Sequence, residues 1–212
     1  MPKQIDMETK SNKTIVAEFY KYIIGQRNEA LIDTYVREDY IQHSPSGKDG
    51  REGLREMIGY LKTLPLPVEK TSPIKLILAD GDFVAGLMHI SLMGKRMFVV
   101  DLFRIKDGQL AEHWDAVQDT VDNDFNEIVI DPAADAGINK ELVRTRYESL
   151  DKYQAHKVIG EGDIVIAQLE FAVDDQRFVR YDILRVSDKI IDQILSVQQQ
   201  IPDVMTHNNG MI

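Results

Sequence analysis

Three side chains that can carry protons alternate along one predicted pair of strands. Residues 99–118 read VVDLFRIKDGQLAEHWDAVQ, two strand-like runs joined by a Lys-Asp-Gly turn. Because successive side chains of a strand point to opposite faces, His113 and Asp115 share one face, and Asp101 on the preceding strand can join them. Two acids and an imidazole on one sheet face are suited to general acid-base catalysis. In the alternative interpretation these residues lie at a rim, and Trp114 packs in a core or an interface.

The composition predicts a globular protein without nucleic-acid or membrane partners. The chain has 212 residues, of which 43% are hydrophobic, enough for one large core or two small ones. Its net charge is -10, and Lys and Arg form no cluster suited to a phosphate backbone. The first residues are polar, unlike a signal peptide, and no later run is long enough to span a membrane. Cysteine is absent, which is typical of a reducing compartment, so we expect a cytoplasmic protein.

Helices are predicted first and strands afterwards. Apolar residues recur at helical spacing in residues 12–24, 28–36 and 48–64, with Ser11 as an N-cap of the first helix and Pro65 and Pro67 ending the third. A short strand is expected at residues 40–43. Four further strands are expected at residues 74–79, 83–93, 96–105 and 109–117, separated by Gly-containing turns. This order indicates the α+β class, with helices covering one face of a sheet.

Four motifs, QHSP, DGREGL, VDLFR and DGQLAEHWD, follow one another in the first half of the chain. In order and spacing, residues 12–120 resemble the SnoaL-like polyketide cyclases. These belong to the cone-shaped, nuclear transport factor 2-like (cystatin-like) superfamily, which also holds ketosteroid isomerase. The resemblance implies a curved antiparallel sheet that encloses a pocket together with three N-terminal helices. Members include isomerases, cyclases, dehydratases, epoxide hydrolases and non-catalytic binders, so the fold alone does not choose an activity.

The resemblance also assigns roles to the two acids. Asp115 matches the acid-base carboxylate of the SnoaL-like cyclases, whose ring closure is an intramolecular aldol condensation that needs neither metal nor cofactor. Asp101 falls on the neighbouring pocket position. There the cyclases carry a histidine, whereas ketosteroid isomerases carry an acid that stays protonated and donates to an oxyanion. This departure places the substrate class of the cyclases in question for this chain.

A steroid isomerase is disfavoured by the remaining positions. His43 ends the first strand, where the isomerases carry their general-base Asp. The oxyanion-binding Tyr of the isomerases would fall near Phe19, while Tyr20 and Tyr22 lie on other faces of the predicted helix.

These assignments lead to a mechanistic hypothesis with a small hydrophobic carbonyl compound as substrate and no cofactor. We expect ionised Asp115 to abstract a C–H proton next to a carbonyl, while protonated Asp101, helped by His43 or His113, stabilises the enolate. The expected enzyme is a lyase or isomerase. The alternative is a non-catalytic small-molecule-binding or assembly module. The residues expected to bind substrate are His89, Phe19, Trp114 and Phe103.

A metal site is not expected. His43, His89 and His113 could supply nitrogen ligands, with Asp115 as a carboxylate ligand. The histidines show neither the HxH nor the HxxxH spacing of common metal sites. A lone histidine on an apolar strand, such as His89, is more often a hydrogen-bonded core residue.

The strand pattern occurs twice. Residues 160–201 repeat residues 79–120 at a constant offset of 81, without gaps. At this offset eight pairs of residues are identical, whereas average composition gives roughly two or three. This excess predicts an internal duplication. In the alternative interpretation, any two strand meanders share turns and alternation. The identical pairs are Gly81 and Gly162, Asp82 and Asp163, Val84 and Val165, Arg96 and Arg177, Asp101 and Asp182, Arg104 and Arg185, Asp107 and Asp188, and Gln118 and Gln199.

The second copy is predicted to be incomplete and catalytically silent. Ile194, Ser196 and Glu170 stand where the first copy has His113, Asp115 and His89. Residues 137–151 leave room for one helix only. We expect residues 1–120 to form the cone domain, 121–136 a linker with one extra strand at 125–130, 137–205 the partial repeat, and 206–212 a frayed tail. The second sheet is expected to pack on the outer face of the first as an internal pseudo-protomer, with a homodimer as the alternative.

Overall fold

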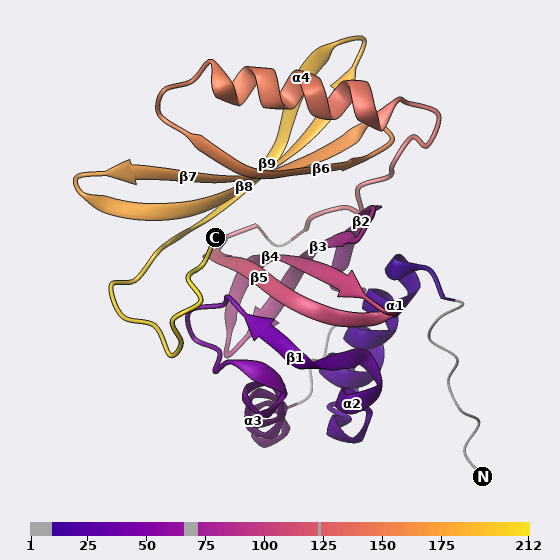
Figure 1. Ribbon diagram of the computed structural model, residues 1–212, viewed down its shortest axis with the longest axis vertical. Helices are drawn as coiled ribbons and strands as arrows, with labels where there is room; N and C mark the ends of the chain where they lie inside the picture. Colours follow the sequence, from indigo (N-terminus) through magenta and orange to yellow (C-terminus); the bar gives the residue numbers. More distant parts are fainter. Residues whose placement is uncertain (1–9, 66–71, 123) are drawn as a thin grey trace.

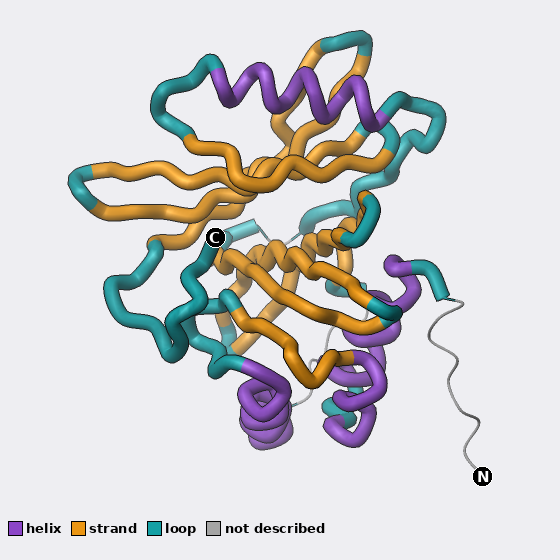
Figure 2. The backbone as a smooth tube through the Cα atoms, viewed as in Figure 1, coloured by secondary structure: helices purple, strands orange, loops and turns teal. Residues whose placement is uncertain are grey.

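Two β-sheets pack face to face, and helices cover their outer faces. Figure 1 shows this arrangement in a computed structural model, which describes residues 10–65, 72–122 and 124–212. Pro67, expected to help end the third helix, lies outside the described residues. Figure 2 shows the strands in the middle and the helices on the two outer sides. The predicted α+β class, with a curved sheet, N-terminal helices and a second strand meander with one helix, is confirmed.

The first half contains the predicted helices and a five-stranded sheet. Strands β2 to β5 end within two residues of their predicted bounds, because Gly-containing turns separate them. The helical elements are α1 (Asn12–Glu18), the π-helix η1 (Phe19–Gly25), the 3-10 helix η2 (Glu29–Leu31), α2 (Ile32–Tyr35) and α3 (Gly50–Thr63). The strands are β1 (Val36–Gln42), β2 (Ile74–Asp80), β3 (Phe83–Leu92), β4 (Lys95–Lys106) and β5 (Gln109–Asp119).

The strand order is β1-β5-β4-β3-β2. Strands β2 to β5 form an antiparallel meander, whereas β1 runs parallel to β5. The expectation of a wholly antiparallel sheet is therefore corrected at one edge. Because β1 and β5 are far apart in the sequence, no hairpin turn fixes their relative direction.

The first helix differs from its prediction in its second half. The side chain of Ser11 accepts a hydrogen bond from Thr14 N and caps α1, as expected. From Phe19 onward the backbone is a π-helix. The wider turn brings both Phe19 and Tyr20 to the buried side, which a regular helical period does not predict.

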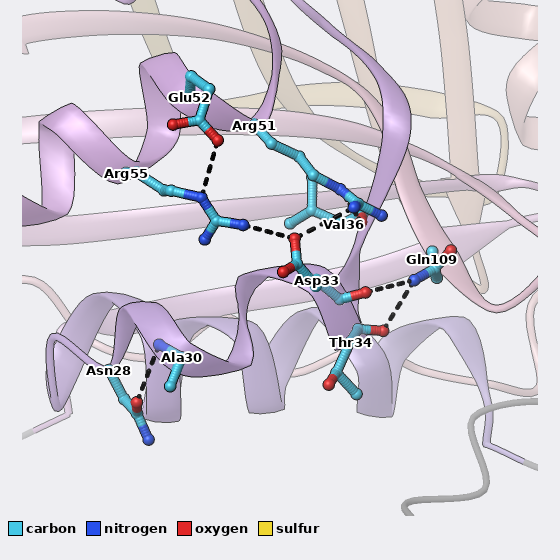
Figure 3. Close-up of polar contacts among 9 residues, drawn as sticks. All are labelled: Asn28, Ala30, Asp33, Thr34, Val36, Arg51, Glu52, Arg55 and Gln109. Atoms are coloured by element: carbon cyan, nitrogen blue, oxygen red, sulfur yellow. Dashed lines mark hydrogen bonds and ion pairs between the residues drawn. The ribbon is translucent and has the colours of Figure 1, made fainter.

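Helices α2 and α3 are held to the sheet by a network of charged and polar side chains (Figure 3). Arg51 Nε donates to Val36 O over 2.8 Å, and Arg55 pairs with Asp33. Gln109, at the start of β5, donates to the backbone oxygens of Asp33 and Thr34, each over 3.0 Å. This network fixes the entry into β1. No described helix is long and apolar enough to cross a membrane.

The second half contains one helix and a four-stranded antiparallel sheet in the order β6-β7-β8-β9. Its strands β7 to β9 have the bounds of β3 to β5 shifted by 81 residues. Between the halves, residues 124–130 form no strand, although Ile128 N donates to Lys75 O over 2.7 Å. The elements are α4 (Ala136–Glu148), β6 (Gln154–Glu161), β7 (Ile164–Val173), β8 (Gln176–Ser187) and β9 (Ile190–Gln200).

Two pairs of hydrogen bonds between the sheets are reciprocal. Val117 N donates to Gln199 Oε1 over 2.9 Å, and Gln198 N donates to Gln118 Oε1 over 2.8 Å. The 81-residue offset converts each of these bonds into the other. The pair of bonds from Ala79 N to Glu161 and from Gly160 N to Asp80 behaves in the same way. Such reciprocity is the pattern of an isologous two-fold interface.

The helices α1 and α4 make equivalent contacts with the two sheets, although the residues that match are more than 81 positions apart. Asn12 donates to Gly81 O over 3.0 Å, and Asn139, 127 residues later, donates to Gly162 O over 2.9 Å. Helix α4 therefore occupies in the second half the place of α1 in the first. The second half has no counterpart of η2, α2, β1 or α3 among the described residues.

The two sheets bury one continuous apolar core between them. On the first sheet this core takes the side chains that alternate with the acids and point away from the helices. Met211 joins the same core and is 2% exposed, so the prediction that residues 206–212 fray is wrong. The principal residues of this core are Leu76, Leu78, Ala85, Leu87, Phe98, Val100, Leu102, Trp114 and Ala116 on the first sheet, and Ile159, Ile164, Ile166, Val179, Tyr181, Ile183 and Val197 on the second.

The shared core predicts that the two halves unfold together. Ile183, in the second sheet, is 0% exposed, so Ile183→Ala should lower the free energy of unfolding by about 2 to 5 kcal/mol. Fluorescence of Trp114, the single tryptophan, reports the first sheet, and far-ultraviolet circular dichroism reports both. Urea titrations followed by the two signals should shift together.

The control is Ile190→Ala, because Ile190 is 62% exposed and this change should alter stability by no more than about 0.5 kcal/mol. A Trp114 transition that stays in place while the circular dichroism transition splits would show that the halves are independent.

Candidate functional site

The three proton-carrying side chains predicted on one face meet beneath the N-terminal helix. Asp101 and Asp115 are register partners on β4 and β5, and His113 lies opposite Phe103. Asp101 is 5% exposed, and the His113 side chain is 12% exposed. The Phe103 ring stacks on the His113 imidazole with a centroid distance of 4.7 Å. The strand alternation thus brings Asp101, His113, Asp115 and Phe103 together.

Tyr20 completes the cluster from the π-helix. Its hydroxyl donates to Asp101 Oδ2 over 2.8 Å. Burial and the charge of Asp101 raise the pKa of Tyr20 well above its ordinary value, so the hydroxyl remains a donor. A Cβ at Gly86 would lie 2.6 Å from the hydroxyl oxygen, so the glycine makes room for this contact. Sequence reasoning placed Tyr20 on another helical face, because no pattern in the sequence signals the π-helical turn.

Gln42, at the end of β1, fixes the tautomer of His113. Gln42 Oε1 accepts the backbone N–H of His43 over 3.0 Å and that of Ser44 over 2.9 Å, which identifies this atom as the amide oxygen. The same oxygen lies 2.9 Å from His113 Nδ1. An amide oxygen can only accept, so His113 Nδ1 carries a hydrogen. Sequence analysis did not single out Gln42, because its role depends on a loop folding back.

The contact between His113 and Asp101 therefore holds one shared proton. His113 Nε2 lies 2.9 Å from Asp101 Oδ1. Since Nδ1 is already protonated, the bond joins either an imidazolium to a carboxylate or a neutral imidazole to a carboxylic acid. Burial works against the imidazolium, but the hydrogen bond to Asp101 and the charges of Asp101 and Asp115 together raise the pKa of His113. The pair can donate a proton from either partner.

Asp115 is the carboxylate without a full set of partners. Its Oδ1 is buried and has no hydrogen-bond partner among the described residues, while the Ser44 side chain bonds to the carboxylate. Burial raises the pKa of Asp115 to about 6, and the charge of Asp101 adds to this against the opposing effects of His113 and Ser44. A carboxylate with this pKa is ionised near neutral pH and more basic than an exposed one.

His43 and Trp114 lie together on the opposite side of the sheet. The His43 ring stacks on the Trp114 indole with a centroid distance of 4.5 Å, and Lys157 Nζ lies 4.2 Å from the indole centroid. Burial lowers the pKa of His43. Trp114 faces the second sheet because it alternates with His113 and Asp115 on β5, and His43 reaches the same side by stacking on Trp114. The structure therefore does not bring these two predicted site residues to the acids.

His89 and Phe19 also lie away from Asp115. His89 is 3% exposed, stacks on Phe98, and has Nε2 3.1 Å from Asp122 O, on the side of the second sheet. His89 is thus a hydrogen-bonded core residue, as is usual for a lone histidine on an apolar strand. Phe19 is 4% exposed and packs edge-on against Phe103, which separates it from His113.

Among the described residues, the cluster that could hold a metal ion is the same triad. One ligand atom from each of Asp101, His113 and Asp115 lies within 4.8 Å of the others. Both nitrogens of His113 are engaged in hydrogen bonds, so a cation would have to replace the proton shared with Asp101. The chemistry of the triad can be derived from protons alone.

Two surface hollows lie apart from this triad. One, of about 560 Å³, is lined by Arg37, Glu38, Asp39, Arg51 and Gln109 beside the contacts of Figure 3. The other, of about 370 Å³, lies between α4 and β6 and includes Tyr147 and Tyr153. Asp101, His113 and Asp115 line neither hollow.

The raised pKa of Asp115 predicts a specific dependence of stability on pH. The carboxyl group of Asp115 stays protonated up to about pH 6 in the folded protein, whereas its ordinary pKa is 3.8. The contribution of Asp115 to the free energy of unfolding is therefore highest below about pH 4 and falls as the pH rises through 6. Asp115→Asn removes this loss. At pH 8 the variant should exceed the wild type by up to roughly 3 kcal/mol, and at pH 4 the two should converge.

Urea unfolding at both pH values measures the difference. Asp119→Asn is the matched control, because Asp119 lies on the same strand with a side chain that is 66% exposed. Equal pH dependence in wild type and Asp115→Asn would contradict the assignment.

Comparison with known proteins shows what the first half of the chain is similar to. Residues 16–113 match the SnoaL-like domain. No curated protein matches the chain. Among solved structures, IdmH from Streptomyces antibioticus is 19% identical with a TM-score of 0.41, and the match covers 50% of this chain and 92% of that one.

Two further structures cover about the same share of this chain. TsrD from Streptomyces laurentii is 20% identical with a TM-score of 0.37, covering 51% of this chain and 91% of that one. A SnoaL-like polyketide cyclase from Agrobacterium tumefaciens is 9% identical with a TM-score of 0.42, covering 51% and 93%.

The matched segment, residues 16–113, contains Tyr20, Gln42, Asp101 and His113 and ends two residues before Asp115. It spans the π-helix, β1 and most of the first sheet. Residues 16–113, a little under half of the chain, are therefore similar to the SnoaL-like domain.

Proposed function

We propose that this protein is a cofactor-independent acid-base enzyme that acts on a small hydrophobic carbonyl compound. The expected reaction is an aldol-type ring closure, an isomerisation or a related lyase reaction. The observation that carries the proposal is the carboxylate of Asp115, a partly buried residue with one buried, unpartnered oxygen and a pKa of about 6, beside a proton donor. Perturbed titratable groups of this kind concentrate at functional sites.

Asp115 serves as the base in this proposal. Its carboxylate takes a proton from a carbon next to a carbonyl, and the C–H electron pair forms an enolate. Desolvation makes the carboxylate more basic, and a positioned base of this type contributes about 10²- to 10⁴-fold to a rate. Asp115 is the residue that the resemblance to SnoaL-like cyclases assigns to this step.

The pair of Asp101 and His113 serves as the acid. Its shared proton lies on the same sheet face as Asp115, so it can hydrogen-bond the enolate oxygen as charge develops there. Tyr20 donates to Asp101 Oδ2 and stabilises the carboxylate that remains. In ring closure, the enolate carbon forms a bond to a second carbonyl carbon of the same molecule. The new alkoxide takes the proton of the pair, and the proton on Asp115 restores the pair.

The aromatic surroundings support an apolar substrate. Phe103 stacks on His113, and Tyr20 and Tyr40 are 7% and 4% exposed. Phe103 remains a proposed substrate contact, and the cytoplasm remains the proposed location, on the strength of a chain without cysteine.

Replacing the base tests the proposal directly. Asp115→Asn should reduce deuterium exchange into an activated 1,3-dicarbonyl compound, followed by NMR, by roughly 10²-fold or more. The exchange rate of the wild type should rise with pH through about 6, because the base must be ionised. Ring closure of a linear poly-β-ketone, followed by mass spectrometry, should show the same loss.

Asp119→Asn serves again as the control and should keep the wild-type rate. Full exchange activity in Asp115→Asn would overturn the role of this residue.

The alternative function, a non-catalytic binding or assembly module, is favoured by one observation. The acids and His113 bond to one another and line neither surface hollow. A module of this type would bind a hydrophobic ketone with equal affinity in wild type and Asp115→Asn and would exchange no proton. Calorimetry beside the exchange assay distinguishes the two functions.

We further propose that the second half is a degenerate duplicate that acts as an internal pseudo-protomer. The reciprocal hydrogen bonds, the shared strand offset and the matching Asn12 and Asn139 contacts support this origin. In the second half, Asp182 accepts bonds from Tyr147, Arg180 and Ser196, so its carboxylate is fully engaged. This saturation supports a silent site.

A pseudo-protomer already covers the face that a partner chain would use. Multi-angle light scattering should therefore give the mass of one 212-residue chain at micromolar concentration. A stable dimer under these conditions would contradict the pseudo-protomer.

A further inference from the structure

The chain that follows β9 crosses from the second half to the active-site loop of the first. We call residues 203–212 the C-terminal strap and residues 42–49, from the last residue of β1 to the start of α3, the site loop. Figure 1 shows the strap in yellow running down beside the start of α3 and returning to the gap between the sheets. The two segments meet through a series of hydrogen bonds.

Backbone oxygens of the site loop accept hydrogen bonds from the strap. Asn209 Nδ2 donates to Gln42 O over 2.9 Å. His207 Nε2 donates to Ser44 O over 2.8 Å. The hydroxyl of Thr206 donates to Gly47 O. Within the loop itself, Gly47 N donates to Ser44 O over 3.1 Å.

The bond from His207 has a defined direction. The backbone N–H of Asn209 donates to His207 Nδ1 over 3.2 Å, so Nδ1 is the bare nitrogen of a neutral ring. Nε2 then carries the hydrogen that Ser44 O accepts. A bond within the strap thus orients the His207 ring for its contact with the loop.

An apolar anchor and a histidine fasten the end of the strap. Met211 is 2% exposed in the core between the sheets. His43 Nδ1 donates to Gly210 O over 3.0 Å, and the same ring stacks on Trp114. His43, predicted as a catalytic residue, therefore connects the loop to the strap.

The site loop carries two side chains that act on the proposed catalytic groups. Gln42 Oε1 holds the proton on His113 Nδ1, and Ser44 bonds to Asp115. The same two residues supply the backbone oxygens that Asn209 and His207 bind. The strap therefore acts at two residues, each in direct contact with a proposed catalytic group.

We infer that the C-terminal strap positions Gln42 and Ser44, with His207 and Asn209 as its positioning residues, so that the second half controls the proton state of the site in the first half. The catalytic consequence rests on the proposed function. The positioning itself does not, because the tautomer of His113 can be observed without substrate.

The test uses the full chain with two changes, His207→Ala and Asn209→Ala, combined in one variant. Long-range ¹H–¹⁵N NMR of the His113 ring should show a proton fixed on Nδ1 in the wild type, whichever of Nε2 and Asp101 holds the shared proton. In the double variant the two nitrogens should give averaged shifts, because Gln42 no longer selects one tautomer. Gln42→Leu, which removes the acceptor directly, should give the same averaged shifts and sets the full size of the effect.

Asn208→Ala is the matched control, because Asn208 is the neighbour of Asn209 and its side chain is exposed. It should leave the His113 spectrum unchanged. Circular dichroism confirms folding, and single variants at His207 and Asn209 replace the double variant if it does not fold. Wild-type His113 shifts in folded strap variants would overturn the inference.

Activity provides the second readout. The double variant should lower kcat by roughly 10- to 100-fold with a smaller change in KM, as expected for misplaced catalytic groups. If the wild type shows no exchange activity but the double variant gives averaged His113 shifts, the proposed function is contradicted and the positioning role of the strap still holds. Unchanged shifts in an active protein would contradict the strap alone.

Discussion

The apolar face of the first sheet that points away from its helices must be buried, and this requirement organises the rest of the molecule. The second sheet covers it, so Trp114 points into a shared core while His113 and Asp115, its neighbours on β5, point the other way beneath the helices. One strand thus satisfies two demands, a continuous apolar interface on one side and a polar cluster on the other. The reciprocal hydrogen bonds between the sheets fix their relative position, and with it the path of the strap.

Inside the polar cluster, hydrogen-bond direction decides the chemistry. Gln42 can only accept through its oxygen, so the proton on His113 Nδ1 is fixed and the second proton is shared with Asp101. Asp115 is left as the carboxylate with an unpartnered oxygen. Two acids in similar surroundings are in this way divided between the roles of proton donor and base. The proposed reaction follows from this division and needs no group beyond the side chains of the first half.

The sequence predicts what depends on local alternation and fails where distant segments meet. Strands β2 to β5 and the shared face of Asp101 and Asp115 follow from a period of two and from Gly-containing turns. Tyr20 could not be placed, because a π-helical turn shifts the helical faces without a local signal. His43 follows the last residue of β1, and its side depends on a loop that the strap fastens from far along the chain.

The central claim, that Asp115 is a base tuned by burial, is tested most directly by its own titration. NMR of selectively ¹³C-carboxyl-labelled aspartates should show one side-chain carboxyl with a midpoint near pH 6, and this signal should disappear in Asp115→Asn. If the carboxyl signal that disappears in Asp115→Asn titrates near the ordinary value of 3.8, the account of the site is wrong.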